Sequence, residues 1–375
     1  MKKIGIVTLY DDINIGNKLQ NYAVQTFFTN LGYQCKTIRH WEMAHFLIKK
    51  GIKNRLIALL GVPQKRAKII RMQAKRKERF RDFSNKYLRL GPEIRFKKIP
   101  EDLRDKYDYF VTGSDQVWHN WTNTTKEIEY FFLTFAKENQ RLTIAPSFGK
   151  NDIENEFCDV YKKGILGIPY ITCRENQGAK MIKSLTGKNA TVILDPTMLI
   201  DTNEWLKIEK QPNAFTGKKY ILTYSLGEMS QEITQFISRV ADKNHFEIID
   251  IFNVEMEKYY YTTPDEFIYY IRHAEIVITD SFHATVFSIL FHRNFIVFDR
   301  NTTTMGNMSS RLDTLLNTFQ LQDRKYGLVN LDQLFITDFS MVDSILEQER
   351  AKSKKIYNDT FEILDRLKKQ EEKQE

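Results

Sequence analysis

The sequence predicts an α/β protein of two Rossmann-like domains that face each other across a cleft. Two successive series of alternating strands and helices lead to this expectation, and a stretch with a proline and a glycine, residues 203–217, separates them. A chain of 375 residues also exceeds the size at which one hydrophobic core usually stops growing. We expect an N-terminal domain at 1–205, a C-terminal domain at 216–340 and a helical tail at 341–375.

In the first series, an apolar strand at residues 4–8 leads through a polar loop into an amphipathic helix, and a second strand follows at 33–38. This order is typical of a parallel sheet with a crossover helix. The later strands are short apolar runs that end in polar residues: YDYFVTGSDQ, LTIAPSFG, YITCREN and VILDPT. The second series contains KKYILTYSLG, FEIIDIF, EIVITD and NFIVFD. Because open α/β sheets bind ligands at the carboxyl ends of their strands, these polar turns are the candidate sites.

Cysteine usage and hydropathy favour a cytoplasmic protein. The three cysteines are widely spaced and form no C-x-x-C pair, so we expect neither a disulfide framework nor a cysteine zinc site. The N-terminus lacks the apolar stretch of a signal peptide, and no apolar run is long enough to span a bilayer.

Most of the net charge of +8 comes from one segment. Residues 42–90 hold 15 Lys/Arg and 3 Asp/Glu, a balance of +12, which leaves −4 for the rest of the chain. We expect basic helices here, and the charge leaves two interpretations open: a solvated helical pair, or a peripheral contact with anionic lipid at the inner face of the plasma membrane. Nucleic acid is not expected as a partner, because no aromatic or Gly-rich RNA motif accompanies the charge.

The sharpest local pattern is EIVITDSFHATVFSILF. A buried strand ends at Thr279, and Asp280 or Ser281 is expected to cap a helix that begins near Phe282. His283 would then lie in the first helical turn, beside backbone N–H groups that favour an anion. From the residues alone His283 either serves such an anion site or is a partly buried histidine bonded to the backbone of a capping turn.

A second polar cluster follows the strand of VTGSDQVW. Ser114, Asp115, Gln116 and Trp118 lie close together in the sequence. Asp115 is a candidate general base or a helix cap, and Trp118 either stacks on a sugar or anchors the loop.

The loop YDDINIGN opens the first helix. Gly16 is expected to provide the turn and Asn17 to cap the helix, and Gln20 adds an amide that suits hydroxyl-rich ligands. The segment lacks the GxGxxG pattern and the lysine of a nucleotide-binding loop.

Two arginines emerge at the ends of predicted elements. Arg174 follows the strand of ITCREN, where it could hold a carboxylate or phosphate or simply pair with Glu175, and Arg311 begins the helix of SSRLDTLL. No zinc spacing, HExxH or GxSxG motif is present, and Asp11 and Asp12 are a poor metal pair. We therefore expect neither a metal nor a cofactor.

Taken together and in order, GNKLQNYAVQ, FVTGSDQVW, SFG, ITCREN, LDPT, YSLG, TDSFHATVFSILF and SSRLDTLL resemble the polysaccharide pyruvyl transferase family. The resemblance covers roughly residues 4–320 and is carried most specifically by GSDQVW and DSFHAT. It implies a fold similar to GT-B glycosyltransferases, with the active site between the domains. It also implies transfer of a pyruvyl group from phosphoenolpyruvate to two hydroxyls of a sugar, which forms a cyclic ketal during capsule or exopolysaccharide biosynthesis.

By this resemblance His283 is the general acid/base and Arg174 helps to bind phosphoenolpyruvate. Several family members carry an arginine two residues before this histidine, where the present chain has Ser281, so the candidate replacements are Arg311 or a lysine that the sequence does not single out. The acceptor would be a glycan or a sugar on a membrane polyprenyl diphosphate. Two alternatives stay open: a GT-B glycosyltransferase that uses a nucleotide sugar, and a non-catalytic glycan-binding relative.

Overall fold

The computed structural model describes residues 1–40, 64–96, 98–299 and 309–373, and its two large sheets are parallel, as the sequence predicts. The first sheet has five strands, in the order β3 (Leu90–Ile94), β2 (Gln34–His40), β1 (Lys3–Val7), β4 (Tyr109–Asp115) and β5 (Arg141–Pro146). Every pairing in it is parallel. The chain therefore starts in the middle of the sheet and builds outward to both edges, as in doubly wound folds.

Helices and a small sheet complete the N-terminal half. The helices are α1 (Ile15–Asn30), α3 (Gln64–Tyr87), α4 (Thr125–Phe131), α5 (Cys158–Leu166), α6 (Asn176–Thr186), α7 (Pro196–Leu199) and α8 (Thr202–Leu206). The small sheet pairs β6 (Thr172–Cys173) with β7 (Thr191–Val192) in parallel, and 3-10 turns lie at Glu101–Asp105, Glu138–Gln140 and Asn155–Phe157.

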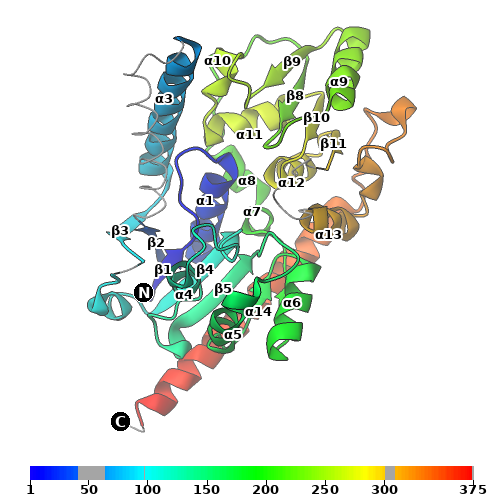
Figure 1. The fold of residues 1–375 in the computed structure, drawn as a ribbon. Helices are drawn as coiled ribbons and strands as arrows, with labels where there is room; N and C mark the ends of the chain where they lie inside the picture. Colours follow the sequence, from blue (N-terminus) through cyan, green and yellow to red (C-terminus); the bar gives the residue numbers. More distant parts are fainter. Residues whose placement is uncertain (41–63, 97, 300–308, 374–375) are drawn as a thin grey trace.

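The second half repeats this architecture with a four-stranded parallel sheet. Its order is β11 (Phe295–Val297), β10 (Ile276–Thr279), β8 (Tyr220–Tyr224) and β9 (Glu247–Asp250). The helices are α9 (Gln231–Asn244), α10 (Glu257–Tyr260), α11 (Pro264–His273), α12 (Phe282–Leu290) and α13 (Ser309–Phe319), and 3-10 turns lie at Gln322–Arg324 and Leu331–Gln333. The two halves face each other in a GT-B-like α/β arrangement (Figure 1).

The C-terminal helix α14 (Val342–Glu371) returns to the first half (Figure 1). The Tyr357 hydroxyl donates to the backbone oxygen of Thr143 at 2.7 Å, and the Phe361 ring stacks on Tyr33 at 4.2 Å. The carboxylate of Asp365 pairs with the Lys2 ammonium at 2.5 Å. The tail is therefore part of the packing of the first half, although the chain reaches it only after completing the second.

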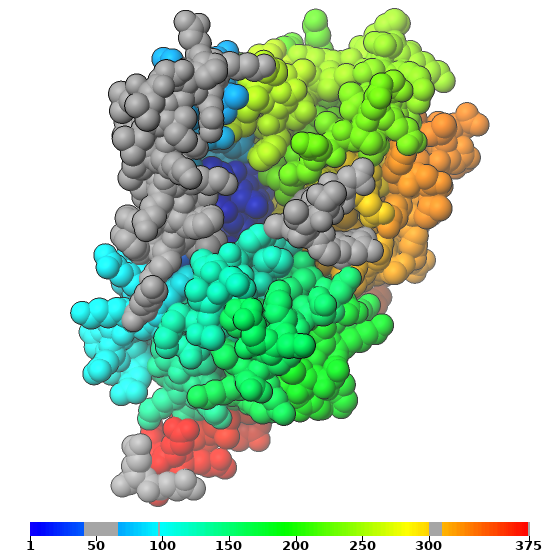
Figure 2. All heavy atoms as spheres, viewed as in Figure 1, coloured from blue at the N-terminus to red at the C-terminus, as the bar shows by residue number. Residues whose placement is uncertain are grey.

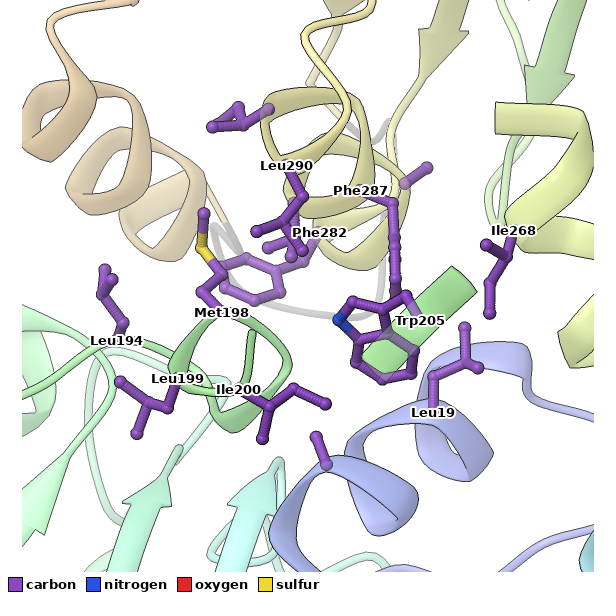
Figure 3. Packing of buried hydrophobic residues seen from close by; sticks show 14 of the residues in the cluster. Leu19, Leu194, Met198, Leu199, Ile200, Trp205, Ile268, Phe282, Phe287 and Leu290 are labelled. Atoms are coloured by element: carbon purple, nitrogen blue, oxygen red, sulfur yellow. The ribbon is translucent and has the colours of Figure 1, made fainter. Parts of the chain in front are cut away.

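A single hydrophobic core crosses the junction between the halves (Figure 3). Leu19 of α1, Met198 of α7 and Trp205 of α8 lie on one side, and Phe282 and Phe287 of α12 lie on the other. The Trp205 and Phe287 rings meet edge to face at 4.8 Å. Because apolar side chains of both halves leave water together, this contact fixes how the halves meet, and polar groups next to it lie in a dry environment.

The basic helix α3 adds a second contact across the junction. Arg76 is 1% exposed and donates to the backbone oxygens of Ile251 and Tyr260, both in the second half. Of the basic segment predicted at 42–90, residues 42–63 lie outside the described residues. Among the helices that the structure describes, none is long and apolar enough to cross a membrane. In Figure 2 the N-terminal residues, dark blue, reach the surface between the two halves.

Candidate active site

His283 lies where the two halves meet. It is the second residue of α12, which begins directly after β10, and Ser281 caps this helix by accepting a hydrogen bond from the backbone N–H of Ala284 at 3.4 Å. The predicted cap and the predicted position of His283 in the first turn are therefore confirmed. His283 is 7% exposed, and its Nε2 has no hydrogen-bond partner among the described residues.

Asp195 holds the centre of a buried polar cluster opposite His283. Its Oδ2 lies 3.9 Å from His283 Nε2, too far for a hydrogen bond, and accepts hydrogen bonds from Ser114 Oγ at 2.6 Å and Arg174 Nη1 at 2.9 Å. Its Oδ1 accepts from the backbone N–H and the hydroxyl of Thr197. Four hydrogen bonds therefore fix the Asp195 carboxylate, and its Oδ2 also faces the imidazole of His283.

Arg174 is buried with three acids around it. Besides Asp195, Asp115 Oδ1 lies 3.6 Å from Nη2 and Glu175 Oε2 lies 3.9 Å from Nε. Neither Nε nor Nη2 has a hydrogen-bond partner within the described part of the chain. The guanidinium also lies 4.4 Å from the ring of Phe282, the residue before His283. A buried arginine with unused donors is unusual, because each unmade hydrogen bond costs free energy.

Asp115 and Gln116 connect this cluster to α1 and α13. Asp115 has a positive φ of 66°, and its carboxylate accepts from the side-chain amide of Asn17 and from the backbone N–H of Gln116. With its amide oxygen toward α13, Gln116 accepts hydrogen bonds from both terminal nitrogens of Arg311 at 2.9 Å. Arg311 thus contacts the residue that directly follows Asp115, the last residue of β4.

The charges in this cluster shift pKa values in opposite directions. Burial lowers the pKa of His283, and the positive charges of Arg174 and Arg311 lower it further against the pull of two acids. Burial alone would raise the pKa of Asp195, but the charges of His283 and Arg174 and hydrogen bonds from Ser114 and Thr197 bring it to about 2. Asp195 is therefore ionised at neutral pH, whereas the free imidazole is mostly neutral.

The first turns of five helices converge here. Gly16 of α1 packs against the imidazole of His283 in α12, α6 begins after Arg174, Asp195 caps α7, and Arg311 is the third residue of α13. Helix N-termini carry partial positive charge and open N–H groups. Together with the two arginines they offer donors to an anion, against the negative charge of Asp115, Glu175 and Asp195.

Two predictions about the N-terminal loop are corrected by the structure. Asn14, not Asn17, caps α1: its side chain accepts from the backbone N–H of Asn17, whose own amide turns to Asp115. Gly16 is a helical residue, not a turn. A Cβ there would lie 2.1 Å from Nδ1 of His283, so the glycine is needed for close approach of the two helices.

Gln20 and Trp118 are fully inside the protein. Gln20 Nε2 donates to the Thr8 hydroxyl at 2.8 Å and to the backbone oxygen of Asn17, so it positions the loop. Trp118 is 1% exposed and stacks on Phe132 at 4.7 Å. Of the two predicted roles for Trp118, the structure supports the loop anchor and excludes the stacking surface for a sugar, because no face of the ring is open.

Asp195 and Glu175 are site residues that the sequence argument did not select. Asp195 is the second residue of the motif LDPT, and a capping aspartate before a proline at the end of an apolar strand is the same kind of signal that points to Ser281. For Glu175 the sequence predicts only an ion pair with Arg174. Its Oε1 accepts from the Ser147 hydroxyl and the Phe148 backbone N–H, and burial raises the pKa of this carboxyl.

No group of three metal-ligating side chains gathers anywhere in the described ranges. A cavity of about 420 Å³ opens between the halves at another place, where α3, residues 210–214 and α11 meet. None of the residues around His283 lines it.

The model of a family described as polysaccharide pyruvyl transferase matches residues 14–302. The chain belongs to the polysaccharide pyruvyl transferase family. The matched range includes Gly16, Asp115, Arg174, Asp195 and His283, all members of the cluster. As a member of this family the chain is related to transferases that modify polysaccharides. A comparison with curated proteins gave no match.

Solved structures similar to this pyruvyl transferase family member include nucleotide-sugar enzymes. A candidate UDP-N-acetylglucosamine 2-epimerase from Listeria monocytogenes is 8% identical, with a TM-score of 0.48 over 86% of this chain and 90% of that one. The UDP-GlcNAc 2-epimerase from Neisseria meningitidis, bound to UDP-GlcNAc, is 10% identical, with a TM-score of 0.42 over 94% and 100%. The Anabaena protein HepE, in complex with UDP and glucose, is 9% identical, with a TM-score of 0.43 over 96% and 100%.

Proposed function

We propose that this chain transfers the pyruvyl group of phosphoenolpyruvate to two hydroxyls of a sugar and forms a cyclic ketal. The observation that carries the proposal is the unpartnered Nε2 of His283, 3.9 Å from the ionised Asp195 and beside a buried arginine with unused donors. The family assignment supports pyruvyl transfer onto a polysaccharide or its precursor.

The donor binds by its two anionic groups. Phosphoenolpyruvate carries a carboxylate and a phosphate, and Arg174 and Arg311 offer forked cationic donors from opposite halves of the protein. The helix N-termini at the junction add backbone donors and partial charge. The charge of Arg311 acts on His283 and lowers its pKa. Arg311 therefore takes the role of the arginine that several family members carry at the position of Ser281.

The transfer balances as three proton transfers and the departure of phosphate. A proton is added to the methylene carbon of the enol ether, which becomes a methyl group, and the neighbouring carbon becomes an oxocarbenium-like centre. A sugar hydroxyl attacks this carbon and loses its proton. Phosphate then leaves with the C–O bonding pair, and a second hydroxyl closes the ketal as its proton passes to the phosphate or to a base. His283 donates the first proton and accepts one from a hydroxyl.

The low pKa of His283 in the free protein suits this cycle. A neutral imidazole is ready to accept a proton, and an anionic donor beside it raises its pKa and favours the imidazolium. Asp195 stabilises the imidazolium from 3.9 Å and holds Arg174 in place. Asp195 therefore acts through His283 and Arg174 and is a positioning residue.

The acceptor is a glycan or a sugar carried on a polyprenyl diphosphate at the inner face of the membrane. Exposed cations of α3, such as Arg71 and Lys86, are available for anionic lipid, whereas Lys68 and Arg81 pair with acids of the protein at 3.0 and 2.8 Å. Flotation with vesicles of neutral and of anionic lipid tests this contact. Equal binding to both kinds of vesicle contradicts it.

The test of the function is to incubate the protein with phosphoenolpyruvate and a panel of galactose- and mannose-type acceptors. We expect release of phosphate and an acceptor that carries a pyruvate ketal, detected by mass spectrometry. Absence of turnover over the whole panel, together with thermal stabilisation by a UDP-sugar but not by phosphoenolpyruvate, would overturn the proposal in favour of a glycosyltransferase.

A further inference from the structure

An exposed tryptophan lies beside the cluster without an assigned role. Trp121 is 36% exposed, whereas Trp118 and Trp205 are at most 1% exposed. Its indole Nε1 donates to the backbone oxygen of Gln116 at 3.0 Å, and the side chain of Gln116 contacts Arg311. The ring is thus joined to the donor-binding arginine through a single residue.

The loop that carries Trp121 is rigidly held. The buried carboxylate of Glu127 accepts from the backbone N–H of Trp121 at 3.0 Å and from the backbone N–H and hydroxyl of Thr122. Asn120 and Asn123 have positive φ values of 63° and 54°. Asparagine adopts this left-handed region more readily than most residues, so both positions suit the turns of the loop.

The ring itself is placed as a platform. It rests against the imidazole of His119 with the ring centroids 4.2 Å apart, and its exposure leaves part of the ring surface to solvent. A tryptophan that only anchors a loop hides its ring, as Trp118 does three residues earlier. Next to it, Asn120 is 8% exposed, and its Nδ2 has no hydrogen-bond partner among the described residues.

We propose that Trp121 is the platform on which the apolar face of the acceptor sugar stacks, with the Asn120 amide donating to one of its hydroxyls. This inference rests on the proposed function. The C–H face of a pyranose packs on an aromatic ring, and a neighbouring buried amide supplies the polar contact that fixes orientation. The platform brings the sugar to the same strand end that positions Gln116 and Arg311, so its hydroxyls meet the donor there.

The experiment compares Trp121→Ala, Trp121→Phe and the matched control Tyr269→Ala. Tyr269 also stacks on a histidine, His273, at 4.0 Å, but on α11. We expect Trp121→Ala to raise the acceptor KM by about tenfold and to leave the KM for phosphoenolpyruvate within about twofold, from the loss of one aromatic contact. Trp121→Phe should recover most of the affinity, and Tyr269→Ala should behave as the wild type. An unchanged acceptor KM in Trp121→Ala would overturn the proposal.

A binding measurement separates this inference from the proposed function. Saturation-transfer NMR with methyl galactopyranoside and methyl mannopyranoside reports sugar contact without turnover. A signal that Trp121→Ala loses and Trp121→Phe keeps supports the platform, even if phosphoenolpyruvate proves not to be the donor. Turnover with phosphoenolpyruvate and an equal signal in wild type and Trp121→Ala would leave the function standing and remove the platform.

Discussion

Two polar clusters join the halves of this protein, and they differ in how completely their charges are satisfied. At the contact of α3 with α11, the carboxylate of Glu266 accepts from Arg79 at 2.8 Å, from Lys210 at 3.0 Å and from the backbone N–H of Thr263 at 3.1 Å. In that cluster Arg79 Nε has no hydrogen-bond partner among the described residues, but the Glu266 carboxylate is bonded on both oxygens; around His283, two nitrogens of Arg174 and the imidazole Nε2 have none.

This difference separates a structural contact from a site prepared for a ligand. A buried carboxylate such as Glu266 that is bonded on both oxygens fixes the geometry, whereas several unused donors gathered at one point are costly and persist where a ligand completes them. The helix N-termini around His283 reinforce the second interpretation, since they favour an anion. Changes around His283 should therefore lower activity, whereas a change at Glu266 should lower stability alone.

The largest effect is expected for His283→Asn. Removing a general acid/base lowers kcat by about 10²–10⁴-fold, and the amide should occupy the space of the ring without unfolding the protein. Phosphate release and the thermal midpoint measure the two quantities. His273→Asn, on the surface of α11, serves as the matched control. Activity within a few-fold of the wild type would remove His283 from the mechanism.

Asp195→Asn should lower both activity and stability. The amide nitrogen faces the Arg174 donor, so a buried guanidinium loses its nearest counter-ion, at a cost of about 3 kcal/mol. Because the pKa of Asp195 is about 2 in the folded protein and ~3.9 when unfolded, its ionised form adds stability above pH ~4 that is lost as pH falls toward 2. Denaturant unfolding at several pH values should show this slope in the wild type and a shallower one in the variant. Equal pH dependence of stability in the wild type and the variant would contradict the low pKa of Asp195 in the folded protein.

Glu266→Gln should lower stability and leave activity unchanged. We expect a loss of about 1–2 kcal/mol in the free energy of unfolding, reduced because Arg79 is one-third exposed, and an unchanged kcat per folded molecule. Urea unfolding and phosphate release provide both values. A large fall in kcat with intact folding would show that this cluster is not merely structural.

The smallest effect is a pKa difference. NMR titration of the imidazole should place the pKa of His283 below 6.5 in the free protein, because burial and two arginines disfavour its charge. Addition of phosphoenolpyruvate should raise this value. No change upon saturation with phosphoenolpyruvate would mean that the anion binds elsewhere.

Local patterns predicted much of this site, and long-range packing accounts for what they missed. The strand end and cap before His283 follow from neighbouring residues. Asp195 lies 88 residues before His283, and no local rule indicates that the two meet. Likewise, the sequence predicts a turn at Gly16, whereas the structure requires a glycine there because His283 of α12 packs against it. Trp118 and Trp121 share one loop, and only packing decides which ring is exposed.

The central claim is that His283 protonates the methylene carbon of phosphoenolpyruvate on the way to a ketal. Turnover in D₂O, followed by NMR and mass spectrometry of the acceptor, tests it most directly. We predict a ketal methyl group that carries deuterium in the wild-type product, and no ketal with His283→Asn. A ketal without solvent deuterium in its methyl group, or the same labelled product from the variant, would contradict the account.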